Sequence, residues 1–293
     1  MNWNKSQLSP NGATIAAFRE DGTLYKIFDP FNNPTSGIIE LPQGTYNLIA
    51  FNNTIGEFEG SIGFTGTDSW STFTAYAVTD LDRTAKLGGN DNDLIVKELD
   101  TLAIERFMGL NVTTDMINYY HDRPDGNIGI AKTIELSPKR VISMFHVKVH
   151  VKGLKYAKNN TIALLRGMAG AYYPGLDKYS SFSVTHMFNL NSRIYDDITN
   201  TDGTISASLL TFGIHERESN PDAKYYLDLI FTLINGQKYS VSFDITDKLK
   251  VSEDVQIELN LDLEIELPTI IGEDGGFDID VDDWDEEVVV IPI

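Results

Sequence analysis

The sequence predicts an all-β protein, because apolar residues recur with a period of two, turn signals separate these stretches, and helical periodicity is weak. Residues 143–152 and 255–267 alternate apolar and polar side chains along their whole length. This pattern is typical of an antiparallel sheet with one solvated face. The turn sequences Glu20-Asp21-Gly22 and Asn235-Gly236 lie between such stretches and predict hairpins.

Shorter stretches of the same kind predict further strands. These are residues 13–19, 23–28, 36–41, 45–52, 73–79, 181–190, 205–215, 225–234 and 238–245. Helix is expected in two places. The first is residues 92–108, where the acidic cluster Asp91 to Asp93 resembles a helix cap. The second is residues 113–121, where Thr113 or Thr114 is the expected cap.

The chain has 293 residues, enough for two domains of ordinary size. A turn-rich connector, HDRPDGNIG, begins at His121, and a new series of strands is expected from residue 130. Frequent turns between short strands favour β-sandwiches. We therefore expect a β-sandwich domain at 1–129, a second at 130–271, and an acidic spacer with a C-terminal strand at 272–293.

The composition excludes several classes of function. There are 23 Lys plus Arg against 43 Asp plus Glu, giving a net charge of −20, which disfavours nucleic acid and anionic lipid as partners. With no cysteine, disulfides, thiolate metal sites and a cysteine nucleophile are excluded. No apolar run approaches the roughly 20 residues of a membrane span, and no signal peptide is visible. The charge suggests an extracytoplasmic or surface protein.

No catalytic or metal motif is apparent, so the chain is expected to be non-enzymatic and without cofactor. His146 and His150 share a strand face with Lys148 and Lys152, and this favours a solvated face over a metal site. The acidic residues 273–287 lack the spacing of a calcium loop and predict a solvated spacer. A glycosidase-type carboxylate pair stays open, because 43 acidic residues allow any geometry.

A cluster of aromatic residues suggests a second class of function. Tyr172, Tyr173 and Tyr179 could form a platform on which sugars stack. The competing interpretation is that they are packed residues at the rim of a β-sheet. The alternative function is therefore a surface glycan-binding module.

The last six residues are apolar throughout and largely β-branched. They are Val288, Val289, Val290, Ile291, Pro292 and Ile293, and they follow the Gly-rich acidic stretch. Such a segment can pair with the exposed sheet edge of another molecule while alternate side chains fill pockets. Equally, it can close the second domain's own sandwich. The sequence leaves both interpretations open.

Three stretches resemble the fimbrillin-like proteins of Bacteroidales, in a poorly characterised branch. They are LPQGTYNLIAFNN at 41–53, ALLRGMAGAYY at 163–173 and the closing FDIDVDDWDEEVVVIPI. The resemblance covers nearly the whole chain. It implies two transthyretin-like β-sandwich domains in tandem and a cell-surface fimbrial or adhesion subunit.

The resemblance also implies a mode of assembly. In that family, stalk subunits polymerise by strand exchange after an arginine-directed protease removes an N-terminal strand. Transferred here, Val288 to Ile293 would be the donor strand, and Arg19 would be the best cleavage position. The implied partners are other fimbrial subunits and surface glycans or proteins of host or bacteria. The implied location is the outer membrane, after export as a lipoprotein precursor whose leader this chain does not include. The cysteine that carries the lipid is missing, so lipidation is implied by the resemblance alone.

Overall fold

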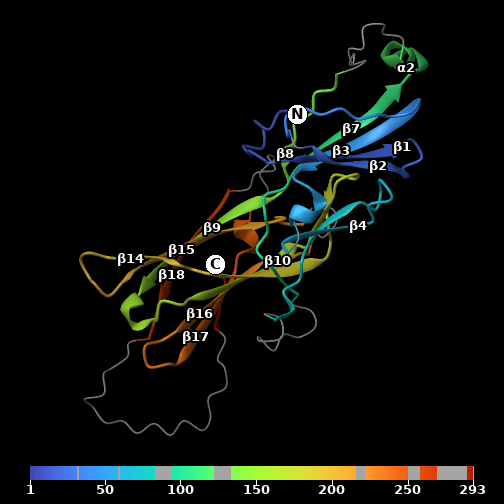
Figure 1. Ribbon diagram of the computed structural model, residues 1–293. Coiled ribbons are helices and arrows are strands. Elements are labelled where there is room, and N and C mark those ends of the chain that lie inside the picture. Colours follow the sequence, from blue (N-terminus) through green and yellow to red (C-terminus); the bar gives the residue numbers. More distant parts are fainter. Residues whose placement is uncertain are drawn as a thin grey trace, which may run out of the picture. The chain divides into compact units, whose positions relative to one another are not determined.

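The computed structural model describes residues 1–31, 33–58, 60–82, 94–121, 133–215, 222–249, 258–268 and 289–292 (Figure 1). The chain groups into two compact units. Unit 1 comprises Met1–Val78, Leu99–Ile142 and Gly170–Ser180, and unit 2 comprises Thr79–Glu98, Ser143–Ala169 and Ser181–Ile293. Each unit is built from two sheets, so the predicted all-β sandwich fold is confirmed.

The units are interleaved along the chain, whereas the sequence predicts one boundary after residue 129. Residues 79–98 belong to unit 2, and residues 133–142 and 170–180 belong to unit 1. The physical reason is that a strand's pairing partner is chosen by long-range packing, while the sequence pattern reports only local alternation. The predicted boundary between residues 271 and 272 lies outside the described residues.

Unit 1 contains a five-stranded and a four-stranded sheet within the described residues. Its strands are β1 (Ala13–Arg19), β2 (Leu24–Phe31), β3 (Gly44–Asn52), β4 (Ile62–Thr65), β5 (Thr74–Ala77), β7 (Ala103–Val112), β8 (Lys139–Arg140), β11 (Ala171–Tyr173) and β12 (Lys178–Tyr179). The sheet orders are β2-β1-β3-β7-β8 and β12-β11-β5-β4. Figure 1 shows β1, β2, β3 and β7 side by side.

Aromatic side chains pack between the two sheets of unit 1. Phe51 on β3 stacks on Phe64 of β4, with ring centroids 5.2 Å apart. Phe18 on β1 makes edge contacts with Trp70 at 5.6 Å and Phe73 at 6.0 Å. Such pairs add to the stabilisation that comes from burying aromatic surface, so this cluster forms the core of the first sandwich.

The β11–β12 hairpin is separated in the sequence from the rest of unit 1, which ends at Ile142. It docks on β5 through the pairs Ala171–Tyr76 and Tyr172–Ala75. Gly175, in the turn of this hairpin, lies so close to Trp70 that an added Cβ would be 1.9 Å from the Trp70 carbonyl oxygen. This close approach requires glycine, because any side chain would force the backbones apart.

Replacing Gly175 by alanine is expected to destabilise unit 1 by about 1–3 kcal/mol, because the added methyl group overlaps a backbone atom that cannot rotate away. The free energy of unfolding in urea would measure the loss. Leu176→Ala changes the neighbouring residue, which is 47% exposed, and should cost under about 0.5 kcal/mol. Equal effects of the two substitutions would contradict the close packing at Gly175.

Unit 2 contains a six-stranded and a four-stranded sheet within the described residues. Its strands are β6 (Ile95–Val96), β9 (Ser143–Lys152), β10 (Ile162–Ala169), β13 (Ser183–Asn189), β14 (Ser192–Tyr195), β15 (Gly203–Thr211), β16 (Tyr226–Thr232), β17 (Lys238–Asp244), β18 (Glu258–Glu266) and β19 (Val289–Pro292). The sheet orders are β19-β17-β16-β10-β13-β6 and β14-β15-β9-β18.

The inward faces of these sheets carry the alternating residues that the sequence identifies. On β9, Phe145, Val147, Val149 and Val151 are buried, and the residues between them are more exposed. β9 pairs antiparallel with β15 but parallel with β18. The antiparallel pairing predicted for residues 255–267 is therefore wrong. Period-two alternation reports which face is solvated and carries no information on strand direction.

Two other local predictions are corrected, and one is confirmed. The helix predicted at 92–108 is not found in the described part of that stretch, residues 94–108, which contains β6 and the start of β7. Residues 36–41 form no strand, and Ile38 in this stretch is 58% exposed. The helix predicted at 113–121 is present as α2 (Thr114–His121), with short 3₁₀ turns elsewhere at η1 (Ile55–Phe58), η2 (Leu154–Tyr156) and η3 (Thr246–Lys248).

Candidate assembly strands and a polar pocket

The C-terminal strand lies at the edge of the six-stranded sheet of unit 2. β19 pairs in parallel with β17, with Val289 opposite Val241 and Pro292 opposite Asp244. In this structure the segment therefore pairs within its own chain, through four residue pairs. Val288, Ile293 and the acidic residues 272–287 lie outside the described residues. The donor role of this segment stays a prediction.

Arg19 ends β1 and is exposed at the turn that leads into β2. Its N–H donates to the carbonyl oxygen of Thr23 at 2.8 Å, and its carbonyl accepts from the N–H of Gly22 at 2.9 Å. The guanidinium lies over the Tyr25 ring, 5.2 Å from the centroid. Exposed turns are preferred sites of proteolytic nicking. Cleavage at Arg19 itself stays a prediction.

β1 occupies an inner position between β2 and β3, and both of its faces are buried. Ile15 and Ala17 pack in an apolar cluster with Tyr46. Phe18 points to the opposite face, where it contacts Trp70. Removal of β1 would therefore leave a slot one strand wide, with apolar walls on both sides.

The three candidate glycan-contact tyrosines lie on the β11–β12 hairpin. Tyr172 is only 4% exposed, and its hydroxyl donates to Oδ1 of Asp177 at 2.5 Å. Tyr179 is half-buried, and its hydroxyl donates to the carbonyl oxygen of Val141 at 3.1 Å. The Tyr172 and Tyr179 rings pack together with centroids 5.1 Å apart. Tyr173 is half-buried.

The hydrogen bonds of Tyr172 and Tyr179 help to hold the β11–β12 hairpin in unit 1. Arg106 on β7 donates to Oδ2 of Asp177 at 2.5 Å, so Asp177 links Tyr172 to the five-stranded sheet. Burial, and then the hydrogen bond to Asp177, raises the pKa of Tyr172 above its usual range. A buried Tyr172 ring offers no face to a sugar, and glycan contact by the three tyrosines stays a prediction that would need the hairpin to rearrange.

Replacing Tyr172 by phenylalanine is expected to destabilise the protein by about 1.5–3 kcal/mol, because it removes a hydrogen bond to a carboxylate and keeps the ring. Urea unfolding would measure the difference. Tyr173→Phe, at the half-buried neighbour, is the matched control and should cost under about 0.5 kcal/mol. A negligible effect of Tyr172→Phe would mean that the Asp177 link does not hold the hairpin.

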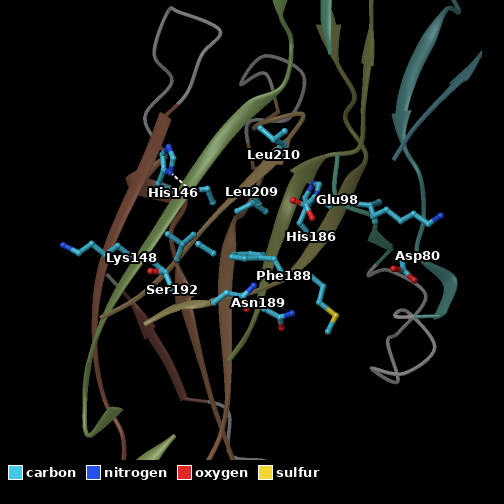
Figure 2. A pocket seen from close by; sticks show the side chains of 18 residues that line it. Asp80, Glu98, His146, Lys148, His186, Phe188, Asn189, Ser192, Leu209 and Leu210 are labelled. Atoms are coloured by element: carbon cyan, nitrogen blue, oxygen red, sulfur yellow. Dashed lines mark hydrogen bonds between the residues drawn. The ribbon is translucent and has the colours of Figure 1, made fainter. Parts of the chain in front are cut away.

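A polar pocket of about 930 Å³ lies within unit 2 (Figure 2). Its walls come from β13, β15 and β9, from the crossing between β13 and β14, and from residues at and after β6. The side chains include amides at Asn189 and Asn191, hydroxyls at Ser192 and Ser206, and the half-buried ring of Phe188. The sequence does not reveal this pocket, because its residues are spread over more than a hundred positions and carry no motif.

His186 is the most unusual group in the pocket wall. It is 3% exposed, and its Nε2 atom has no hydrogen-bond partner among the described residues. Burial lowers the pKa of His186 to about 3, so the imidazole is neutral near pH 7. An enclosed polar atom without a partner is costly and requires an explanation.

The histidines that the sequence identified make cross-strand hydrogen bonds. His146 Nδ1 lies 2.6 Å from the hydroxyl of Ser208, and His150 Nδ1 lies 3.0 Å from that of Thr204. Across the residues that the structure describes, no group of three or more His, Cys, Asp or Glu could hold a metal ion. The described helices include none that is long and apolar enough to span a membrane.

Comparison with solved structures shows that other proteins share this fold. A "putative adhesin" from Bacteroides ovatus is 16% identical, with a TM-score of 0.55 over 90% of this chain and 86% of that one. A "putative cell adhesion protein" from Bacteroides eggerthii is 13% identical, with a TM-score of 0.50 over 90% and 82%. A "putative adhesin" from Bacteroides thetaiotaomicron is 10% identical, with a TM-score of 0.50 over 88% and 84%.

These similarities show a shared fold and confirm the resemblance to the fimbrillin-like proteins that the sequence indicated. No curated protein sequence matches the chain. A family model does match, over residues 1–189, which is well over half of the chain. The protein therefore belongs to the family described as Domain of unknown function (DUF5119).

Proposed function

We propose that this protein is a non-enzymatic fimbrial or adhesion subunit of the bacterial cell surface that assembles by β-strand complementation. Its fold is shared with Bacteroides proteins named as adhesins, and this likeness supports a role at the surface. Its partners would be other fimbrial subunits, together with surface glycans or proteins. Export as a lipoprotein to the outer membrane belongs to the same proposal and rests on the family resemblance.

The observation that carries the proposal is the position of β19. It is a four-residue strand at one edge of its sheet, and among the residues that the structure describes it pairs with β17 alone. A strand at an edge can detach by breaking backbone hydrogen bonds on one side only. In addition, a parallel pair of strands is slightly less stable per residue than an antiparallel pair. Residues 267–288 tether it to β18 and include the acidic spacer. β19 is therefore suited to leave its own sheet and pair elsewhere.

The slot of β1 is the acceptor that fits this segment best. Both faces of β1 are buried, so a replacement strand needs apolar side chains at every position. Residues 288–293 supply apolar side chains throughout, because each of them is Val, Ile or Pro. Pro292 has no N–H to donate to a neighbouring strand, so it would have to lie at the end of the slot. A strand that alternates apolar and polar residues, such as 143–152, would place polar side chains against an apolar wall.

Exchange of the two segments depends on the apolar side chains that each can bury. Full burial of a Val, Ile or Phe side chain contributes about 1.5–3 kcal/mol; β1 supplies two such residues, Ile15 and Phe18, and residues 288–293 supply five, all except Pro292. Ordering the incoming strand costs about 1–2 kcal/mol per residue of backbone. A covalently attached β1 should therefore hold its slot, while a β1 cut free after Arg19 should yield to a donor at sufficient concentration.

Light scattering on two forms of the chain tests the proposal. The full chain and a version that ends at Glu287 are measured before and after brief treatment with an arginine-specific protease, with the cut at Arg19 verified by mass. Only the cut full chain is expected to form a ladder of oligomers. Val290→Asp keeps the length of the tail but places a charge in an apolar slot, and it should shorten the ladder sharply.

Two outcomes would oppose the proposal. If the version ending at Glu287 polymerises as well as the full chain, the donor lies elsewhere. If the cut full chain stays monomeric and the truncation only lowers the stability of unit 2, then β19 belongs permanently to its own sandwich. The protein would then be better explained as a monomeric surface adhesin or as the alternative, a glycan-binding module.

A further inference from the structure

The pocket of unit 2 has the balanced charge of a site for a neutral ligand. Its wall contains the acidic residues Asp80 and Glu98 and the basic residues Lys97 and Lys148, so these charges cancel. This balance is unusual in a chain whose net charge is −20. A site for phosphate would need an excess of cations, and a site for a metal cation would need converging carboxylates.

The uncharged groups of the wall combine hydrogen-bonding and apolar character. Asn189, Asn191 and Ser192 each offer donors and acceptors, and Leu209 and Phe188 offer apolar surface. Figure 2 shows the ring of Phe188 in the middle of the drawn side chains. A volume of about 930 Å³ falls within the range of pockets that enclose organic ligands and is far larger than an ion requires.

His186 adds an unmet hydrogen-bonding group to the same wall. Its side chain lies on the same face of β13 as that of Phe188, two residues further along the strand. Its Nε2 atom is enclosed and without a partner among the described residues, and the ring is neutral near pH 7. A neutral imidazole nitrogen is matched by a hydroxyl group, either of an ordered water or of a ligand that reaches the wall.

We propose that this pocket binds a neutral saccharide, with the ring of Phe188 against a sugar face and the amide of Asn189 on sugar hydroxyls. Sugars present hydroxyl groups, which both donate and accept, around an apolar C–H face. That combination is what the wall of amides, hydroxyls, aliphatic side chains and one aromatic ring accommodates. The site differs from the tyrosine cluster at 172–179, which belongs to unit 1. It does not depend on polymerisation.

Isothermal titration calorimetry on the full chain tests the site. The probes are a panel of neutral oligosaccharides, namely maltohexaose, cellohexaose, laminarihexaose, mannohexaose, xylohexaose and chitohexaose, with inorganic phosphate and calcium chloride as charged probes. At least one oligosaccharide is expected to bind, and phosphate and calcium are not. Phe188→Ala and Asn189→Ala should each weaken that binding by about tenfold, in line with the loss of one stacking or hydrogen-bonding contact.

The controls separate this site from its alternatives. Tyr173→Ala alters the tyrosine cluster of unit 1 and should leave the affinity unchanged. Asn189 is exposed, so Asn189→Ala should fold normally even if Phe188→Ala does not, and circular dichroism would verify both. Absence of binding across the panel, binding that both variants leave intact, or loss in Tyr173→Ala alone would each overturn the proposal. If the full chain binds an oligosaccharide but never polymerises, the proposed assembly by strand complementation is contradicted and the proposed saccharide site is supported.

Discussion

Replacing Arg19 by glutamine is expected to abolish protease-triggered polymerisation while leaving the monomer folded. Arg19 lies at an exposed turn, and glutamine is a shorter polar side chain without the guanidinium that an arginine-specific protease recognises. Without the cut, β1 remains attached to β2 and keeps its buried place between β2 and β3. Light scattering after protease treatment should then show the ladder for the natural chain and monomer for Arg19→Gln.

The matched control is Lys26→Gln, which removes an exposed cation from the middle of β2. This variant keeps Arg19 and its exposed turn, so it should still be cut there and should still polymerise. Loss of the side chain's contact with the Tyr25 ring should cost Arg19→Gln no more than about 1 kcal/mol. Polymers formed by Arg19→Gln after the same treatment would show that release of β1 is not the trigger.

Acidification from pH 7 to pH 5 is expected to destabilise unit 2 by about 2 kcal/mol through His186 alone. Burial lowers the folded-state pKa of this residue to about 3, against an unfolded value near 6.5. Between these values the unfolded chain binds a proton that the folded chain does not. The contribution is therefore fully present above pH 6.5 and is lost as pH falls towards 3. The measured step from pH 7 to pH 5 lies above the range in which most carboxylates titrate.

Urea unfolding at several pH values, followed by circular dichroism, measures this effect. His186→Leu should flatten the dependence on pH between 7 and 5, because leucine has no proton to bind and suits a wall that lies beside Leu165 on β10. Met187→Leu changes the neighbouring residue of β13 without removing a titratable group, so the natural slope should persist. If His186→Leu keeps the full slope, the acid sensitivity arises elsewhere.

Much of the fold could be predicted because the deciding signals are local. β1 at Ala13–Arg19 and β9 at Ser143–Lys152 have the predicted bounds, since each alternates cleanly or ends at a turn sequence. β7 was mistaken for helix because its pattern is broken. A register shift lies where Phe107 and Leu110 pair with β3, and Gly109 there has φ of 72°. Such a bulge disrupts the period of two that identifies a strand.

The pairing of distant segments could not be predicted. Nothing in residues 171–179 shows that they pair with β5, almost a hundred positions earlier, because period and turn chemistry name no partner. The same limit applies to the pocket of unit 2. Asp80, His146, His186 and Ser206 meet only through the order of the strands, so no spacing in the sequence could reveal them. Tyr172 shows the same limit at a single residue, because the sequence left both a sugar-stacking platform and a packed ring open, and the structure buries the ring.

Native mass spectrometry of the cut chain tests most directly whether the C-terminal segment can replace β1. A chain cut after Arg19 is mixed with a synthetic peptide of residues 284–293, which contains the apolar segment and part of the acidic spacer. Strand complementation predicts that the complex loses the mass of residues 1–19 and gains the mass of the peptide. Retention of residues 1–19, with or without bound peptide, would contradict strand complementation at this slot.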